Sequence, residues 1–394
     1  MESSDAVILK KRFICACNLS AKTQNTRIFK VGRKSMKKVK DCVKTCLLLC
    51  GTIFFQNTIF AGTQDFPSKI CAPYTECWNN LSVSSLATST GNKFYTLAFV
   101  ISNSTANSAP FWDGTMPMSD NKYVSDIAAL RAQGGDVIIS FGGSGGSELA
   151  QVYTSATALQ AAYQQVVTKY ALKWMDLDIE GAFIADKAAI DRRNKALKGL
   201  QDANPGLKIS YTLPVMPEGL DQFGLDLLSN AKSNGVQLYV VNVMAMDYGS
   251  CNMDMGQAAI SAAGNTRTQI AGLGISAKIG ITPMIGVNDI ACENFTTANA
   301  SAVETYANAN SYIGLLGFWA MDLDNNHSYI NIFKTFTAPT AVISAIPKSP
   351  ALVHQNQKTG TYDIRGRLIS PVSNNFSVEK TITVNGNKCV LKIK

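Results

Sequence analysis

Residues 173–181, KWMDLDIEG, place three carboxylates at every second position and fill the intervening positions with large apolar residues. Successive side chains of a β-strand point to opposite faces, so Asp176, Asp178 and Glu180 would share one face of a strand. The apolar face needs a hydrophobic cover. Mutual repulsion among carboxylates on the other face would raise the pKa of at least one of them. The stretch therefore predicts a strand that carries a proton donor at neutral pH.

Three interpretations fit this stretch taken alone. The first is a half-exposed strand whose carboxylates face water, which is the usual setting of alternating sequence. The second is an EF-hand calcium loop, but loop position twelve, which requires a bidentate Glu, is Lys187. The third is a catalytic acid at the end of a buried strand. The rest of the chain has to decide among them.

From about residue 66 the chain alternates short β-rich runs with helical ones. Strands are expected at 70–74, 94–102, 136–146 (running into a glycine-rich loop), 173–181, 208–215, 236–248, 278–285 and 313–321. Helices are expected at 124–133, 156–170, 187–204, 225–234, 257–274 and 297–309. Eight strands with intervening helices are typical of a closed parallel barrel, and no GxGxxG turn supports the alternative of a doubly wound sheet. We expect an α/β fold, a (β/α)8 TIM barrel over residues 62–338, with a short C-terminal β-rich appendage.

Polar residues recur at the ends of the expected strands. Asp247 and Tyr248 end the sixth strand, Asn288 and Asp289 follow the seventh, and residues 319–322 close the eighth. In a (β/α)8 barrel these carboxyl ends meet on one face, where active sites lie. The pattern favours the third interpretation of residues 173–181.

These motifs together resemble glycoside hydrolase family 18, the chitinases and their relatives, over about residues 66–338. The fourth-strand signature Asp-x-Asp-x-Glu of that family is matched by Asp176, Asp178 and Glu180. The supporting matches are SFGG at 140–143, MDY at 246–248 and Trp319, and the runs YTLPV (211–215), MAMDYG (244–249) and MIGVND (284–289) are closest to a bacterial and archaeal branch. The chain departs from the family pattern in two places. Lys-Trp at 173–174 replaces the Asp-Gly that begins the full fourth-strand signature, and Gly249 replaces the Asp that often follows the sixth-strand Tyr.

The resemblance implies a role for each catalytic candidate. Glu180 would protonate the glycosidic oxygen and later activate water. The nucleophile would be the substrate's own 2-acetamido oxygen, with net retention of configuration. Asp178 would orient the acetamido group, and Asp176 would hold Asp178 and tune its proton. Tyr248, together with Asp247, would hydrogen-bond the acetamido carbonyl.

The resemblance also implies the substrate, which is chitin or another polysaccharide containing β-1,4-linked N-acetylglucosamine. Trp319 would form the floor of the sugar site. The further binding candidates are Met246, Met284, Asn288 and two loop aromatics, Trp112 and Tyr74. We expect no cofactor and no metal, since the two histidines lack partners at metal-ligand spacing.

Two other functions remain open for the same residues. One is an endo-β-N-acetylglucosaminidase that acts on N-linked glycans or peptidoglycan. The other is a non-catalytic chitin-binding lectin, against which the presence of Glu180 argues.

The formal charge of +8 is concentrated at the N-terminus. Residues 1–61 hold 12 Lys/Arg against 3 Asp/Glu, a net +9, which leaves −1 for the remainder and argues against a nucleic-acid partner. A basic region, ten apolar residues at 46–55 and a small residue near Ala61 predict a signal peptide over 36–61, and ten residues are too few for stable membrane insertion. Residues 1–35 are expected to be an over-called or dispensable extension. We expect a secreted monomer, extracellular or periplasmic.

Five cysteines follow the predicted leader, at 71, 77, 251, 292 and 389. Export permits disulfides, and Cys251 with Cys292 joins loops after neighbouring strands. Cys71 with Cys77 is a second candidate pair. Residues 339–394 carry 8 Lys/Arg against 2 Asp/Glu, a net +6, and Asn385-Gly386 predicts a hairpin turn. This β-rich tail would either bind a polysaccharide or acidic surface or only follow the barrel, and we favour the latter.

Overall fold

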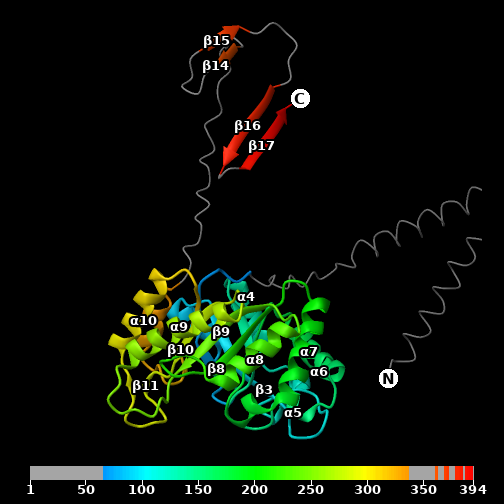
Figure 1. Cartoon of the computed structure of the whole chain (residues 1–394), viewed down its shortest axis with the longest axis vertical. Coiled ribbons are helices and arrows are strands. Elements are labelled where there is room, and N and C mark those ends of the chain that lie inside the picture. The colour runs from blue at the N-terminus through cyan, green and yellow to red at the C-terminus, as the bar shows by residue number, and fades with distance from the viewer. Residues whose placement is uncertain (1–64, 337–359, 363–367, 372–377, 385–386, 394) are drawn as a thin grey trace, which may run out of the picture. The chain divides into compact units, whose positions relative to one another are not determined.

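The computed structural model describes residues 65–336 and, nearer the C-terminus, residues 360–362, 368–371, 378–384 and 387–393 (Figure 1). The chain divides into two compact units, Met1–Ala338 and Pro339–Lys394. The expected leader at 36–61, the extension at 1–35 and the turn at Asn385-Gly386 lie outside the described residues. Each unit is considered by itself.

The strands of the first unit follow the predicted order. Two short strands share the first of the eight barrel positions, and one strand occupies each of the others. The barrel strands are β1 (Ile70–Cys71) with β2 (Tyr74–Glu76), β3 (Phe94–Ile101), β6 (Asp136–Gly142), β7 (Trp174–Asp178), β8 (Lys208–Pro214), β9 (Leu238–Ala245), β10 (Lys278–Pro283) and β13 (Ile313–Leu316). From β3 onward, neighbours in this order pair in parallel. The sixth and eighth strands end earlier than expected, because the chain bends into loops before its polar residues.

The segment 70–76 closes the ring. Its first half, β1, pairs in parallel with β13, and its second half, β2, pairs in parallel with β3. Backbone hydrogen bonds continue on both sides, from the Ala72 N–H to the Leu316 carbonyl at 2.8 Å and from the Thr96 N–H to the Pro73 carbonyl at 2.9 Å. The expected (β/α)8 barrel is confirmed.

Helices and short elements connect the barrel strands (Figure 1). The helices are α3 (Val83–Thr90), α4 (Val124–Ala132), α5 (Leu149–Val152), α6 (Ala156–Tyr170), α7 (Lys187–Ala203), α8 (Gln222–Ser233), α9 (Met255–Gly272), α10 (Thr297–Ala309) and α11 (Ser328–Phe333). The short elements are β4 (Phe111–Trp112), β5 (Met116–Pro117), β11 (Gly286–Val287), β12 (Asn294–Phe295) and the 3₁₀ turns η1 (Met118–Asp120) and η2 (Gly181–Ala185). Helix α3 was not predicted, because its sequence VSSLATST is rich in weak helix formers; Ser82 at its N-terminus and Gly91 at its C-terminus cap it.

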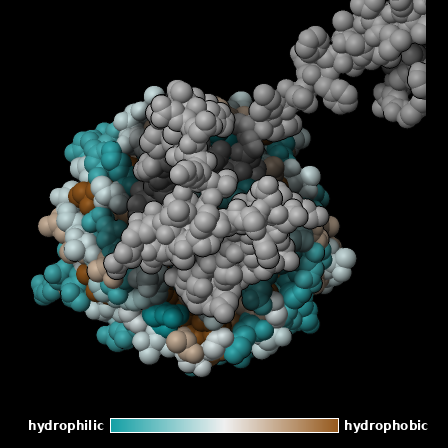
Figure 2. All heavy atoms as spheres, turned by 90° about the horizontal axis from the view of Figure 1, so that it is seen from above, coloured by the Kyte–Doolittle hydropathy of each residue, from teal (hydrophilic) through white to brown (hydrophobic). Residues whose placement is uncertain are grey.

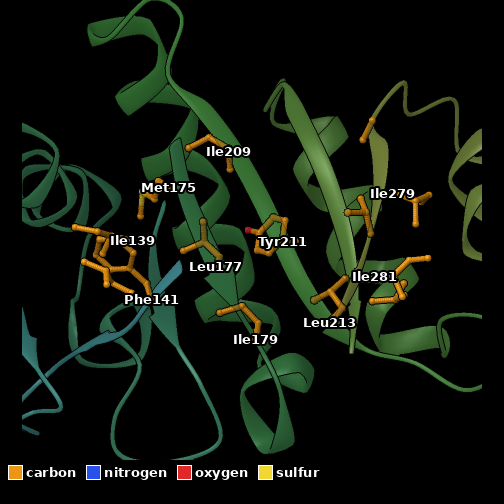
Figure 3. Close-up of a cluster of buried hydrophobic side chains, with 14 of the residues drawn as sticks. Ile139, Phe141, Met175, Leu177, Ile179, Ile209, Tyr211, Leu213, Ile279 and Ile281 are labelled. Atoms are coloured by element: carbon orange, nitrogen blue, oxygen red, sulfur yellow. The ribbon is translucent and has the colours of Figure 1, made fainter. Parts of the chain in front are cut away.

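Along residues 173–181, successive side chains point alternately to the main core and to the barrel interior. Leu177 and its apolar neighbours are fully buried in the main core, beside Phe141 of β6 and Tyr211 of β8 (Figure 3). Trp174, on the opposite face, is fully buried in a second cluster, with Phe66, Ile70, Phe94, Ile138, Val240 and Leu315. Because Trp174 begins β7, this apolar cluster closes the barrel interior at the amino ends of the strands. Above it the interior becomes polar, beginning with Asp176.

The described residues of the C-terminal unit form two antiparallel strand pairs. Strand β14 (Gly360–Tyr362) pairs with β15 (Leu368–Pro371), and β16 (Val378–Val384) pairs with β17 (Asn387–Ile393). The expected β-rich appendage is therefore confirmed.

On the face shown in Figure 2, hydrophilic residues predominate along the visible margin and hydrophobic ones are scattered among them. Within the part of the chain that the structure describes, we find no helix whose length and apolarity would let it cross a membrane.

Candidate active site

A cavity of about 450 Å³ opens at the carboxyl ends of the barrel strands. It brings together seven of the sequence-predicted residues: Tyr74, Asp178, Glu180, Met246, Asp247, Met284 and Trp319. It also contains residues that the sequence analysis did not name as catalytic or binding candidates, namely Phe99, Ser144, Thr212, Pro214, Val215, Met216, Asp221, Met244, Thr282 and Asp289. The remaining four predicted residues, Asp176, Tyr248, Asn288 and Trp112, are not part of the lining.

Asp176 lies beneath the cavity and is almost completely buried, with 2% exposure. Its oxygens accept hydrogen bonds from Tyr74 Oη at 3.1 Å, Ser140 Oγ at 2.8 Å, Ser210 Oγ at 2.5 Å and Thr212 Oγ1 at 3.0 Å. Burial raises the pKa of Asp176, while these hydroxyl donors act to lower it. Its oxygens are therefore engaged by the protein, which suits a fixed support for the residue above it.

Asp178 follows two residues later on the same face of β7 and does line the cavity. Its side chain is 3% exposed, and its Oδ1 has no hydrogen-bond partner among the described residues. Burial raises its pKa well above the usual range, and the nearby carboxylates of Glu180 and Asp176 raise it further. Asp178 therefore combines a raised pKa with an oxygen that no described protein group engages, at the edge of the cavity.

The SFGG run at 140–143 supports Asp178 through the backbone. The Gly143 N–H donates to the Asp178 carbonyl at 3.0 Å. Gly142 has φ +102°, and a Cβ there would approach the Asp178 carbonyl oxygen to 2.0 Å. Only glycine fits this close approach of β6 to β7.

Glu180 lies beyond the end of β7, where the backbone remains extended with φ −141° and ψ −179°. Burial raises its pKa to about 7, and the negative charge of Asp247 contributes to the rise. A carboxyl group with this pKa can donate a proton near neutral pH and accept one afterwards. Glu180 thus has the properties expected of a general acid and base.

Asp247 reaches the cavity from the loop after β9. Its φ is +53°, in the left-handed region, and its Oδ1 accepts a hydrogen bond from the Ile290 N–H at 2.8 Å. Its own N–H donates to Asn288 Oδ1 at 3.4 Å. Burial raises the pKa of Asp247, with Asp289 and Glu293 as neighbouring negative charges.

An aromatic cluster borders the acidic strand. The ring of Trp319 stacks on Phe99 at 5.6 Å with an interplanar angle of 13°, and it contacts Tyr74 at 5.6 Å. Tyr74, the last residue of the expected strand 70–74 and a loop-aromatic candidate, lies in β2, where its hydroxyl reaches Asp176. These rings give the cavity a flat apolar wall next to the carboxyl groups.

The expected sugar-stacking role of Trp112 is wrong. Its side chain is fully buried, its Nε1 donates to Tyr170 Oη at 2.9 Å, and its ring packs edge-on against Tyr123 and Tyr170. Although the residue lies in a short strand after β3, its large apolar ring fills the core next to α6. Trp112 therefore has a structural role.

Tyr248 also departs from expectation. Strand β9 ends at Ala245, and the left-handed turn at Asp247 directs Met246 and Asp247 to the cavity. Tyr248 instead packs in the main core with 6% exposure, and its hydroxyl has no hydrogen-bond partner within residues 65–336. Of the pair Tyr248 and Asp247, only Asp247 lines the cavity.

Asn288 supports the cavity from outside its lining. Its side chain is 4% exposed, and its amide donates to the Met284 carbonyl at 2.9 Å while its Oδ1 accepts from Asp247. The sequence analysis expected Asn288 to bind the substrate directly. The structure instead shows it holding two residues of the lining, Asp247 and Met284.

Of the two expected disulfides, one is present. Cys251 is bonded to Cys292, which joins the loops after β9 and β10. The pair Cys71 with Cys77 is wrong, because both thiols are buried and free. These two residues lie six positions apart in one extended segment, which separates them by roughly 20 Å at 3.3 Å per residue.

Ser210 and Thr212 were missed in the sequence, although a signal for them exists. They alternate along β8 in register with Asp176 and Asp178 of β7. A strand adjacent to an inward-facing acidic strand must offer hydrogen-bond donors on its own inward face. Asp221 and Met216 lie in the loop after β8, where no such periodicity applies.

Comparisons with known proteins give a consistent result, although no family model matches the chain. The chain is 37% identical over 281 residues to a probable bifunctional chitinase/lysozyme of Escherichia coli (strain K12) and 36% identical over 284 residues to endochitinase 11 of Metarhizium anisopliae. Each match covers 66% of this chain, but the chain spans only 31% and 53% of the lengths of these curated relatives. The solved catalytic domain of a hyperthermophilic chitinase from Pyrococcus furiosus is 30% identical with a TM-score of 0.62, and the match covers 71% of this chain and 99% of that one.

Proposed function

The chain belongs to glycoside hydrolase family 18, the chitinase family, and on this basis we propose that it is a secreted chitinase that cleaves β-1,4 links between N-acetylglucosamine residues with retention. One observation carries the proposal. Asp176 and Asp178 on β7 and Glu180 just after it form a series, from a carboxylate engaged by hydroxyl donors, through one with a raised pKa and an unpartnered oxygen, to a proton donor in the cavity.

In the first step Glu180 transfers its proton to the glycosidic oxygen, and the bond from that oxygen to the anomeric carbon breaks. The acetamido oxygen of the same sugar attacks the anomeric carbon and forms a cyclic oxazolinium ion. Asp178, next to Glu180, accepts a hydrogen bond from the acetamido N–H through its unpartnered oxygen and so orients the acetamido oxygen toward the anomeric carbon. The leaving sugar departs with the proton from Glu180.

In the second step the Glu180 carboxylate removes a proton from water. The water oxygen attacks the anomeric carbon, and the bond to the acetamido oxygen breaks. The second inversion restores the original configuration, and Glu180 regains its proton.

The raised pKa of Asp178 supports this route over attack by an enzyme carboxylate. A nucleophilic carboxylate has to be ionised, whereas burial and two neighbouring carboxylates hold the pKa of Asp178 well above the usual range. Asp176, the other candidate, is held by hydroxyl donors beneath the cavity. The substrate's own acetamido group is then the available nucleophile.

A second candidate substrate is peptidoglycan, which also contains N-acetylglucosamine. The observation that favours it is the name of the Escherichia coli relative, a probable bifunctional chitinase/lysozyme. Clearing of a bacterial cell-wall suspension, measured beside chitin hydrolysis, separates the two substrates.

The proposed secretion is supported by the disulfide between Cys251 and Cys292, because disulfides persist in oxidising compartments. N-terminal sequencing of protein recovered from the culture medium or periplasm tests it. A mature protein that retains residues 1–61 would contradict it.

The activity itself is tested with chitin oligosaccharides and the isosteric Glu180→Gln variant. We expect the wild type to release shorter oligosaccharides and the variant to release essentially none, because Gln cannot donate the proton. Absence of products from the folded wild type would remove the proposal. Equal rates for both proteins would remove Glu180 from its role.

A further inference from the structure

Glu293 joins two loops outside the cavity. The loop after β9 carries Asp247 to the cavity, and the loop after β10 carries Asp289. Glu293 itself lies in the loop after β10, is 2% exposed and does not line the cavity. Its Oε2 accepts a hydrogen bond from the Tyr248 N–H at 3.0 Å, and its Oε1 accepts one from the Ser250 N–H at 2.9 Å. One buried carboxylate thus holds the backbone on the C-terminal side of Asp247.

The backbone around Asp247 is also held from the opposite direction. Asn288 Oδ1 accepts from the Asp247 N–H, and the Asn288 N–H donates to the Glu293 carbonyl at 3.0 Å. The Ile290 N–H donates to Asp247 Oδ1, and the Ile290 carbonyl accepts from the Glu293 N–H at 2.8 Å. The contacts form a closed network between the two loops.

A covalent bond reinforces the same pair of loops. Cys251 directly follows Ser250, whose N–H binds Glu293, and Cys292 directly precedes Glu293. The disulfide therefore lies next to the carboxylate and keeps the loops at the distance that its two hydrogen bonds require.

Asp247 needs such support because of its backbone conformation. Its φ of +53° lies in the left-handed region, which residues other than glycine adopt uncommonly and Asp more readily than most, and the contacts described above hold it there. The conformation in turn directs the Asp247 side chain into the cavity.

We propose that Glu293 is a positioning residue for the hydrolytic reaction, which acts on Glu180 by fixing the backbone that carries Asp247. The proposal rests on the proposed function, because hydrolysis of chitin oligosaccharides is its readout. According to this proposal, the conformation of the loop after β9 controls the proton that Glu180 transfers in the reaction.

The charged groups around this pair determine the sign of the effect. Glu180 is faced by Asp178 from β7 and by Asp247, and Asp247 is faced by Asp289 and Glu293 from the loop after β10. If Asp247 moves away, the pKa of Glu180 falls. If only the Glu293 charge is lost, ionised Asp247 is favoured, and the pKa of Glu180 rises instead.

The test is a double-mutant cycle on kcat/KM with Glu293→Gln and Asp247→Asn. We expect Glu293→Gln to lower kcat/KM by about tenfold in the wild type and by less than about twofold in the Asp247→Asn background, since the two residues act as one unit. The basic limb of the pH profile of Glu293→Gln should move to lower pH. If the Gln variant does not fold, Glu293→Asp, whose side chain is too short to reach both N–H groups, takes its place.

Asp324 provides a matched control. It is 1% exposed and accepts hydrogen bonds from two backbone N–H groups, those of Tyr329 at 3.1 Å and Ile330 at 2.8 Å, but none from Asp247. Asp324→Asn should lower the melting temperature without shifting the basic limb.

Each outcome has one meaning. The positioning role would be overturned by an additive cycle, by an upward shift of the basic limb in Glu293→Gln, or by the same downward shift in Asp324→Asn. The proposed function would still stand in these cases if the wild type hydrolyses chitin oligosaccharides. A folded wild type that cleaves no chitin oligosaccharide would overturn the proposed function instead.

Discussion

The hydroxyl of Tyr74 donates a hydrogen bond to Asp176 Oδ2 at 3.1 Å and so joins the first and fourth positions of the barrel beneath the cavity. The same hydroxyl lies 3.0 Å from Thr212 Oγ1, which also donates to Asp176. The ring of Tyr74 meanwhile contacts Trp319. One side chain therefore connects the engaged carboxylate to the aromatic wall.

Tyr74→Phe should separate these two contributions. The ring and its contact with Trp319 remain, whereas Asp176 loses a donor in a buried site. We expect the free energy of unfolding to fall by about 1.5–3 kcal/mol, the range for hydrogen bonds to charged groups. Chemical denaturation measures this change, and an unchanged stability would contradict the network described for Asp176.

The pH dependence of activity follows from Glu180, which must be protonated to act as an acid. Its pKa of about 7 predicts that kcat/KM falls as the pH rises through about 7. Asp247→Asn removes a negative charge that raises this pKa, so the basic limb should move to lower pH. A limb that stays in place in this variant would disprove the influence of Asp247 on Glu180.

Stability should depend on pH through the same group. The pKa of Glu180 is raised in the folded protein, from 4.5 to about 7, so its favourable contribution is complete below about pH 4.5 and is lost as the pH rises through about 7. Gln does not ionise, so Glu180→Gln avoids this loss. The change in unfolding free energy from wild type to variant should be more favourable at pH 8 than at pH 4.5, by up to about 3 kcal/mol. Thermal unfolding at the two pH values measures the difference, and an equal effect at both would contradict the raised pKa.

Removing the disulfide should destabilise the barrel unit. The two cysteines are separated by 41 positions, and closing a loop of this length is worth up to about 4 kcal/mol in the chain-entropy account. We expect the double variant Cys251→Ala, Cys292→Ala to have a lower melting temperature that no longer responds to reductant. Cys77→Ala, which removes a buried free thiol, is the control that should keep the response.

Trp112 and Trp319 should respond differently to substitution. Trp112→Phe loses the hydrogen bond to Tyr170 and leaves a cavity, so we expect a loss of about 1–3 kcal/mol of stability with little change in KM. Trp319→Ala removes part of the cavity wall and should raise KM for chitin oligosaccharides. A raised KM in Trp112→Phe, with the fold intact, would restore the binding role that the structure removes.

Much of the barrel was predictable from the sequence because alternation within a parallel strand is a strong signal. Asp176 and Leu177 illustrate it, since the periodicity assigned them to opposite faces and the structure places them in the polar interior and the main core. The eightfold repetition then fixed the topology. Helix α3 was missed because its stability comes from caps and packing rather than from helix propensity.

The site was predictable where it lies on a strand or within a few residues of a strand's carboxyl end, but not where local backbone turns decide which side chain enters the cavity. Asp178 and Trp319 were placed correctly, whereas Tyr248 was not, because a single left-handed residue at Asp247 reverses which neighbour faces the cavity. Trp112 could not be assigned from sequence, since a large aromatic residue suits either a sugar site or a core. Glu293 gave no sequence signal, because its role depends on backbone groups of a loop 43 residues away.

The participation of the substrate's acetamido group is tested most directly with two aryl chitobiosides that differ only at the sugar bonded to the aryl group. One carries the N-acetyl group at that sugar, and the other carries a free amine. The account predicts that the protein cleaves only the acetylated compound and that NMR detects the β-anomer as the first product. Comparable cleavage of the free amine, or an α-anomer as the first product, would contradict it.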